Sequence, residues 1–238
     1  DIKKVLVIKA INFDKEGWSD SVGGYVVEPA YQQQATLFRN ELRESGNVIN
    51  ATSLSHLPGQ EPVWGTEFRV EDIVPSKAYS LKAIGVDYDF IPTFGLSDIA
   101  GRNFSPLHPS DQGNEKKRAV IINETSRKLL GFETAGEAVS RHISTYWGAE
   151  YEIVGVVNSF HQVSLKEDLT PLYFILQPRA LGYYAVKVQP GDASQILSDI
   201  RTVWSRHFAD YPFNYFFLDE FFNRQYRHEE KFTKVTGL

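Results

Sequence analysis

The stretch YEIVGVVNSFHQVSLKEDLTPLYF, Tyr151 to Phe174, holds two apolar segments separated by a polar one. The first, Tyr151 to Val157, is rich in β-branched side chains and predicts a strand. The second, Pro171 to Leu176, predicts another strand whose proline suits its opening position. The polar residues Asn158 to Glu167 predict the crossover between them. We expect this stretch to be a buried scaffold and not a catalytic loop.

Two further motifs precede this stretch. AGRNF covers Ala100 to Phe104, and AVIINETSRKLLGF covers Ala119 to Phe132. The apolar start of the second motif predicts a short buried strand, and Asn123 is placed to cap a helix over Glu124 to Leu130. Two later pairs have the spacing of a capping box, Thr134 with Glu137 and Asp192 with Gln195.

In this order, the motifs resemble the extracytoplasmic core domain of MacB-like and FtsX-like ABC transporter permeases. In that family an AVIINE-type strand and helix are followed by a segment of the type seen at Ile153 to Phe174. Asn158-Ser159 stands where Lys-Asp is common. VLVIKA, FRNEL and LDEFFNRQYRHEEKF also fit, so the resemblance covers nearly the whole chain.

Each end of the chain has the pattern of a β-α-β unit. Near the N-terminus, strands at Lys4 to Ala10 and Asn47 to Ser53 flank a helix at Ala30 to Ser45, whose apolar residues recur every three or four positions. Near the C-terminus, strands at Gly182 to Gln189 and Pro212 to Leu218 flank a helix that begins near Asp192, with a broad apolar face. Two such units separated by a strand-rich region suggest a split fold.

We therefore predict an α+β fold in which a split ferredoxin-like β-α-β layer from both chain ends carries an inserted, mostly antiparallel β-rich subdomain. The first subdomain comprises residues 1–57 and 178–238, and the insertion comprises residues 58–177. The turn-rich segment LPGQEPVWG marks the first boundary. Asp219 to Lys234 is expected to form a stalk helix that leads back to the membrane.

Composition restricts the possible functions. The chain has 238 residues, a net charge of −5 and no cysteine. A nucleic-acid partner is not expected, because phosphate neutralisation needs clustered lysine and arginine. No apolar run approaches the roughly 20 residues that span a bilayer. The resemblance implies flanking transmembrane helices outside this segment, with the segment on the periplasmic side of a bacterial inner membrane.

The sequence carries no recognisable catalytic, cofactor-binding or metal-binding motif. The six histidines are scattered, without the spacing of a zinc site, and the glycine-rich nucleotide motifs and the G-x-S-x-G motif are missing. We therefore expect no catalytic residue, cofactor or metal. His161 is the one histidine singled out: a structural ring that fixes the crossover is the favoured interpretation, and a proton-sensitive switch is the alternative.

Aromatic residues in predicted connections are the candidate partner contacts. Large apolar rings in loops can contact a partner or substrate, although such rings more often fold back over the edge of the core. The candidates are Trp18, Tyr25, Trp64, Tyr146 and Trp147.

The resemblance implies a mechanical and non-enzymatic function. It implies a dimeric permease, with a second permease copy and a cytoplasmic ATPase subunit as partners, that moves these domains for export or envelope processes. A periplasmic adaptor or a substrate is a further expected partner. The alternatives are a free-standing periplasmic binding module with a ligand between its subdomains, and an enzyme that uses carboxylates of the insertion. We expect the isolated domain to be monomeric.

Overall fold

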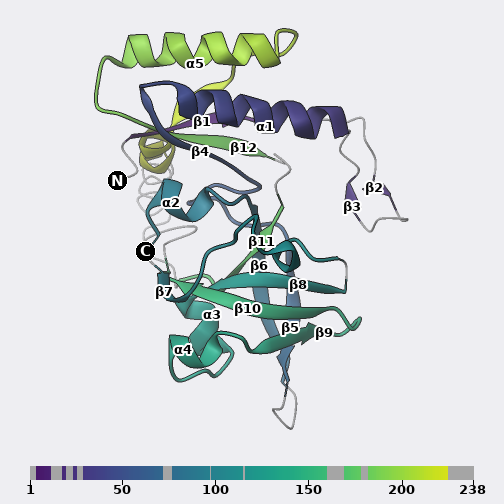
Figure 1. Ribbon diagram of the computed structural model, residues 1–238. Helices are drawn as coiled ribbons and strands as arrows, with labels where there is room; N and C mark the ends of the chain where they lie inside the picture. Colours follow the sequence, from purple (N-terminus) through teal and green to yellow (C-terminus); the bar gives the residue numbers. More distant parts are fainter. Residues whose placement is uncertain are drawn as a thin grey trace, which may run out of the picture.

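The computed structural model is a mixed α+β fold, as the sequence predicts (Figure 1). It describes residues 4–11, 18–19, 24–25, 29–71, 77–96, 98–114, 116–159, 169–177 and 182–224. Two long helices lie along one side of the molecule and cover a thin sheet. Most of the remaining strands lie beyond the opposite face of that sheet.

Strands from both ends of the chain form this sheet, here called the helix-covered sheet. Its strands are β1 (Val5–Lys9), β4 (Val48–Leu54), β12 (Tyr183–Val188) and β13 (Tyr215–Phe217). They are neighbours in the order β4-β12-β1-β13, and each pair is antiparallel. The first described strand of the chain therefore lies hydrogen-bonded between two of the last.

Helices α1 (Pro29–Glu44) and α5 (Ala193–His207) cover one face of the helix-covered sheet (Figure 1). The apolar stripe of α1 predicted from the sequence is buried there, together with the apolar face of α5. The ring of Phe38 meets that of Trp204 edge to face, with centroids 5.5 Å apart, a favoured aromatic geometry. Burial of this stripe against a neighbouring helix and sheet is what makes the segment helical.

Most of the remaining strands form a second body, here called the strand ring. Its strands are β5 (Gly65–Val70), β6 (Tyr79–Val86), β8 (Lys117–Asn123), β9 (His142–Thr145), β10 (Glu150–Val157) and β11 (Leu172–Leu176). Within the described residues they pair in the order β6-β11-β8-β10-β9-β5, and β5 pairs again with β6, which closes the ring. The β6–β11 and β8–β10 pairs are parallel, and the other pairs are antiparallel.

Both faces of the central ring strands are buried. In β8, Val120 and Ile122 belong to one apolar core, while Ala119 and Ile121 belong to another. This double burial explains why AVII and IVGVV are continuous apolar runs, which periodicity alone cannot distinguish from short buried helices. Helices α3 (Glu124–Leu129) and α4 (Ala135–Ala138) follow β8 and cover one side of the ring.

One apolar core is shared by the helix-covered sheet and the strand ring. Val5, Val7 and Ala185 come from the face of the sheet opposite the helices, and Phe174 comes from the ring. Helix α2 (Phe90–Phe94) lies between the two bodies, where Phe90 is fully buried and its ring lies 5.4 Å from that of Phe174. The two bodies therefore share a continuous interior.

The AGRNF and IVGVV motifs meet in space. Strand β7 (Asp98–Gly101) pairs with β10, and Gly101 lies opposite Gly155. Gly101 has φ +81°, and a Cβ at Gly155 would come within 2.4 Å of the Arg102 carbonyl oxygen. A side chain at Gly155 would therefore collide with the backbone, so the glycines of both motifs are structural.

The predicted helix caps are confirmed in part. The Asn123 side chain accepts a hydrogen bond from the Ser126 amide, as expected. Thr134 accepts from the Glu137 amide, but the Glu137 carboxylate accepts from the Glu133 amide and so does not complete a capping box with Thr134. Asp192 caps through the Ser194 amide, while the predicted partner Gln195 donates to Asp199 one turn later.

The remaining elements are short. Strands β2 (Trp18–Ser19) and β3 (Gly24–Tyr25) pair only with each other in the described part of the chain, Pro109–Asp111 form a 3₁₀ turn, and residues 218–224 are helical. The expected stalk thus begins as a helix, and its residues from 225 onward lie outside the described part. None of the described helices has the length and apolar character needed to cross a membrane.

Candidate functional site at the junction of the sheet and the ring

Two of the five aromatic candidates lie together at a hairpin tip. Tyr146 and Trp147 follow β9 and precede β10, and their side chains are 76% and 54% exposed. Their rings contact each other edge to face, with centroids 4.8 Å apart. Two hydrogen bonds hold the hairpin beneath them: the Thr145 amide donates to the Ala149 carbonyl at 2.9 Å, and the Ala149 amide donates to Thr145 Oγ1 at 3.1 Å. A rigid turn thus presents two adjacent large rings to solvent.

Trp64 lies at the start of β5 and is partly folded back. Its ring contacts the imidazole of His56 edge to face at 5.6 Å, which leaves 37% of the residue exposed. Trp18 and Tyr25 pair across the β2–β3 hairpin, and their side chains lie outside the described part of the structure. The structure therefore brings Tyr146 and Trp147 together, and no described contact joins them to Trp64.

His56 anchors the loop that carries Trp64. The Val63 amide donates to His56 Nε2 at 3.3 Å, so Nε2 is the unprotonated nitrogen and Nδ1 carries the hydrogen toward Ser55 Oγ at 2.9 Å. Burial lowers the pKa of His56, because desolvation disfavours the imidazolium form. A neutral imidazole therefore holds this loop. His161, the histidine singled out from the sequence, lies outside the described residues.

The strongest polar cluster lies where the strand ring joins the helix-covered sheet. Asp87 directly follows β6 and is 1% exposed, and Arg39 on α1 is 5% exposed. The Arg39 guanidinium pairs with the Asp87 carboxylate. The same carboxylate accepts from the Ser53 amide at 2.8 Å, from the Asp89 amide at 3.0 Å and from the Thr52 hydroxyl. One side chain thus ties together α1, β4, β6 and the turn into α2.

A second ion pair extends this cluster toward the surface. Arg43, one turn beyond Arg39 on α1, donates to Asp89 at 2.5 Å, and both side chains are partly exposed. Burial raises the pKa of Asp89, an effect that the charge of Arg43 opposes. Both aspartates of the sequence VDYD therefore face arginines on the same helix.

Asp87 and Arg39 are not among the residues predicted from the sequence, although the position of each carries a signal. Arg39 lies four residues after Ala35 and three before Leu42, so it falls on the buried stripe of α1. Asp87 ends a strand of apolar residues. A charged residue in each of two buried positions indicates a buried ion pair, because an isolated charge there would be strongly destabilising.

The AGRNF arginine forms a similar anchor. Arg102 contacts both carboxylate oxygens of Asp111 at 2.7 Å, and Asp111 also accepts from the Ser105 amide at 2.9 Å. Hydrogen bonding to Asp111 raises the pKa of Arg102 further above its ordinary value. This planar pairing fixes the loop between β7 and β8.

The described residues contain no group of three or more histidine or carboxylate side chains placed to hold a metal ion. The buried carboxylates Asp87 and Asp111 are fully engaged with arginines and amides. This geometry positions segments of the chain and leaves neither carboxylate open to a substrate.

The fold is one found in extracytoplasmic domains of bacterial ABC transporter permeases. The periplasmic region of MacB from Actinobacillus actinomycetemcomitans superposes with a TM-score of 0.58 at 13% identity, covering 93% of this chain and 92% of that one. A domain assigned to a permease protein of Porphyromonas gingivalis gives 0.51 at 17% identity, with 90% and 89% covered. The extracellular domain of the noncanonic ABC-type transporter YknZ from Gram-positive bacteria gives 0.50 at 17% identity, with 89% and 97% covered.

The similarity therefore lies in the fold and spans the chain. The resemblance expected from the sequence is confirmed at this level. Comparison of the sequence with protein-family models and with curated proteins gives no match. The three structures are parts of transporters or permeases, and none is described as an enzyme.

We predict that Asp87→Ala lowers the free energy of unfolding by about 3–5 kcal/mol, because it leaves the charge of the Arg39 guanidinium buried without a counter-ion. The double variant Arg39→Met with Asp87→Ala should lose clearly less than the sum of the two single variants. Urea unfolding followed by circular dichroism measures both values. Additive losses would mean that the two side chains act independently.

We also predict that His56 makes the protein less stable in mild acid. Its pKa is lowered in the folded state, so below the ordinary value of 6.5 the unfolded chain binds a proton that the folded chain does not. Stability should therefore fall as the pH drops through about 6.5, by at most about 1.4 kcal/mol per pH unit for one group. His56→Gln should flatten this slope between pH 7 and 5.5, and an unchanged slope would contradict the assignment.

Proposed function

We propose that this chain is the extracytoplasmic domain of a bacterial ABC transporter permease, on the periplasmic side of the inner membrane, and that it transmits ATP-driven motion for export or envelope processes. The observation that carries the proposal is the β1–β13 pairing, through which the chain enters and leaves the body by adjacent strands. Force applied at both ends would act on one sheet. The fold shared with periplasmic and extracellular transporter domains supports this role.

The proposal divides the chain into two subdomains. Residues 1–57 and 178–238 would form a split ferredoxin-like layer, and residues 58–177 would form the β-rich insertion. The strand order β4-β12-β1-β13, with both helices on one face, supports the first assignment. The strand ring lies within the second range, and most of its strand pairs are antiparallel.

A domain that transmits motion must resist deformation. Two features would make this domain rigid. The apolar core shared by sheet and ring leaves no solvent layer between the residues that form it, and packed interiors move as units. At the same junction, the Arg39–Asp87 ion pair links α1 to the end of β6. The body would therefore move as a whole when its attachments move.

The energy would come from other chains. The sequence has no nucleotide-binding motif, so a cytoplasmic ATPase subunit would supply ATP hydrolysis, and a second permease copy would complete the transporter. A periplasmic adaptor or a substrate would contact the outer surface, where we place the rings of Tyr146 and Trp147. No observation favours the free-standing binding module over this proposal.

We predict that ATP moves whole domains relative to each other without changing distances inside one domain. The chain has no cysteine, so spin labels can be attached at Leu37→Cys on α1 and Leu129→Cys at the end of α3, both exposed positions. In the complete transporter, electron–electron distance measurements should show a change between the Leu129→Cys positions of two copies, and a constant Leu37→Cys to Leu129→Cys separation within one copy. An internal change alone would contradict rigid transmission.

We further predict that Tyr146→Ser with Trp147→Ser reduces transport in cells. The melting temperature should stay within about 2 °C, because exposed side chains contribute little to stability. Leu107→Ser is the matched control, since Leu107 is an 85% exposed apolar residue in the connection between β7 and β8, outside the β9–β10 hairpin. Normal transport by the double variant would contradict a role for Tyr146 and Trp147 in partner contact.

A further inference from the structure

A cavity of about 740 Å³ opens beside the end of β1, and neither Tyr146 nor Trp147 lines it. Residues of the helix-covered sheet and of the helical segment 218–224 line it. Its volume lies within the range of sites that take small molecules, roughly 300–1,000 Å³. Neither the sequence motifs nor the proposed mechanical function accounts for it.

Strand register explains which side chains reach the cavity. Lys9 lies opposite Tyr183, and Val7 lies opposite Phe216. Residues directly paired in an antiparallel sheet share a face, and Val7 belongs to the core opposite the two long helices. Lys9, Tyr183 and Phe216 therefore line one continuous face of the sheet, which forms the floor of the cavity.

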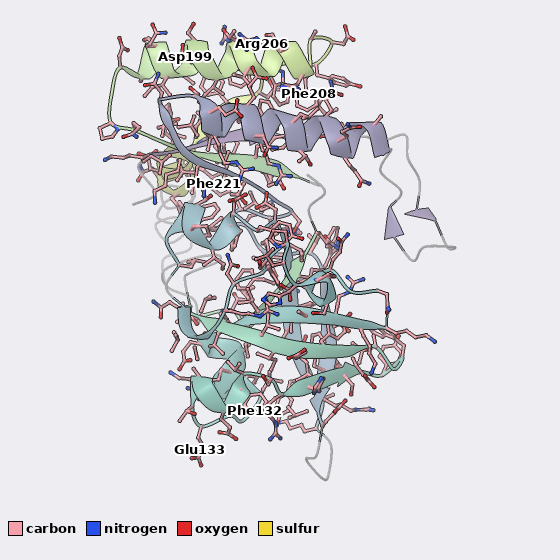
Figure 2. The ribbon with its side chains drawn as sticks, viewed as in Figure 1. Phe132, Glu133, Asp199, Arg206, Phe208 and Phe221 are labelled. Atoms are coloured by element: carbon pink, nitrogen blue, oxygen red, sulfur yellow. The ribbon has the colours of Figure 1, made fainter. Side chains whose placement is uncertain are left out.

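The helical segment 218–224 supplies the wall. Phe221 and Arg224 lie one turn apart, so they face the same side. The Phe221 ring lies 5.7 Å from that of Phe216, and the Arg224 guanidinium lies 6.0 Å from the centre of the Phe216 ring. Figure 2 shows Phe221 close beneath the sheet. The two phenylalanine rings thus lie directly beside the Arg224 guanidinium.

The charges of the lining have one sign. Lys9 and Arg224 are its ionisable cations, and no aspartate or glutamate lines it among the described residues. Neither cation forms an ion pair within the part of the chain that the structure describes, in contrast to Arg39, Arg43 and Arg102. In a protein of net charge −5, these two cations and the aromatic rings of Tyr183, Phe216 and Phe221 form a positive and apolar pocket.

We propose that this cavity binds an anionic amphiphile, with its phosphate or carboxylate group held by Lys9 and Arg224 and its apolar portion on Phe216 and Phe221. Arginine and lysine recognise such anions through charge-assisted hydrogen bonds, and the rings exclude water from the chain of the ligand. A free inorganic anion would leave the aromatic floor unused. A cationic amphiphile would be repelled by Lys9 and Arg224.

The test uses the whole chain and dodecyl phosphate below its micelle-forming concentration, with binding measured by isothermal titration calorimetry. Saturable binding is expected, and Arg224→Gln and Lys9→Gln should each weaken it about tenfold, the effect of losing one hydrogen bond between charged groups. Phe221→Ala should also weaken binding. Unaltered melting temperatures would show that the variants remain folded.

Arg201→Gln is the matched control. Arg201 on α5 also stands over a phenylalanine ring, that of Phe213 at 5.6 Å, but neither residue lines the cavity. Its substitution should leave binding unchanged. Equal losses in Arg201→Gln and Arg224→Gln, equal binding of dodecyltrimethylammonium, or no binding of dodecyl phosphate would each overturn the proposal.

Two sources could supply the same chemistry, and a second arm separates them. If the ligand is a membrane lipid, vesicles of phosphatidylglycerol and phosphatidylcholine should sediment the protein, and Arg224→Gln should abolish this association. If the ligand is a free amphiphile, only monomeric dodecyl phosphate should bind. Both arms work without ATPase or transport, so their outcome is independent of the mechanical proposal.

Discussion

The buried pair of Arg39 and Asp87 is the constraint on which the arrangement of the two bodies depends. Asp87 is positioned at the exit of β6, where the strand ring meets the helix-covered sheet, and its carboxylate engages α1, β4 and α2 at once. A buried charge is strongly destabilising unless it is paired and hydrogen-bonded, so these contacts must be kept together in the folded state. Apolar cores tolerate several similar packings, whereas the contacts of Asp87 require α1, β4 and the turn into α2 to meet at one point.

Much of the fold was predictable because its segments carry strong local patterns. The β-branched runs around Val156 and Ile121, the stripe of α1 and the Asn123 cap all follow from side-chain chemistry near in sequence. The closure of the ring did not follow, because β6 and β11 pair in parallel across some ninety residues and their apolar faces would fit several partners equally well. The two capping boxes are incomplete because the Glu137 and Gln195 side chains bond Glu133 and Asp199 instead.

The site was less predictable than the fold. Exposure of Tyr146 and Trp147 follows from their position in a short connection between two strands, but the contact of Trp64 with His56 depends on tertiary packing. The Arg39–Asp87 pair joins residues 48 positions apart, and no local rule chooses that partner. Lys9 and Arg224 approach one cavity only because the first and last strands are neighbours.

That neighbour relation has a consequence for biosynthesis. Within the described residues, β1 pairs only with β12 and β13, so this strand has no partner until residues 183–217 have been synthesised. All strands of the ring, Gly65 to Leu176, emerge earlier and can close among themselves. VLVIK therefore stays unpaired while residues 10–182 are synthesised, and an unpaired apolar strand of this kind is prone to aggregation before the fold is complete.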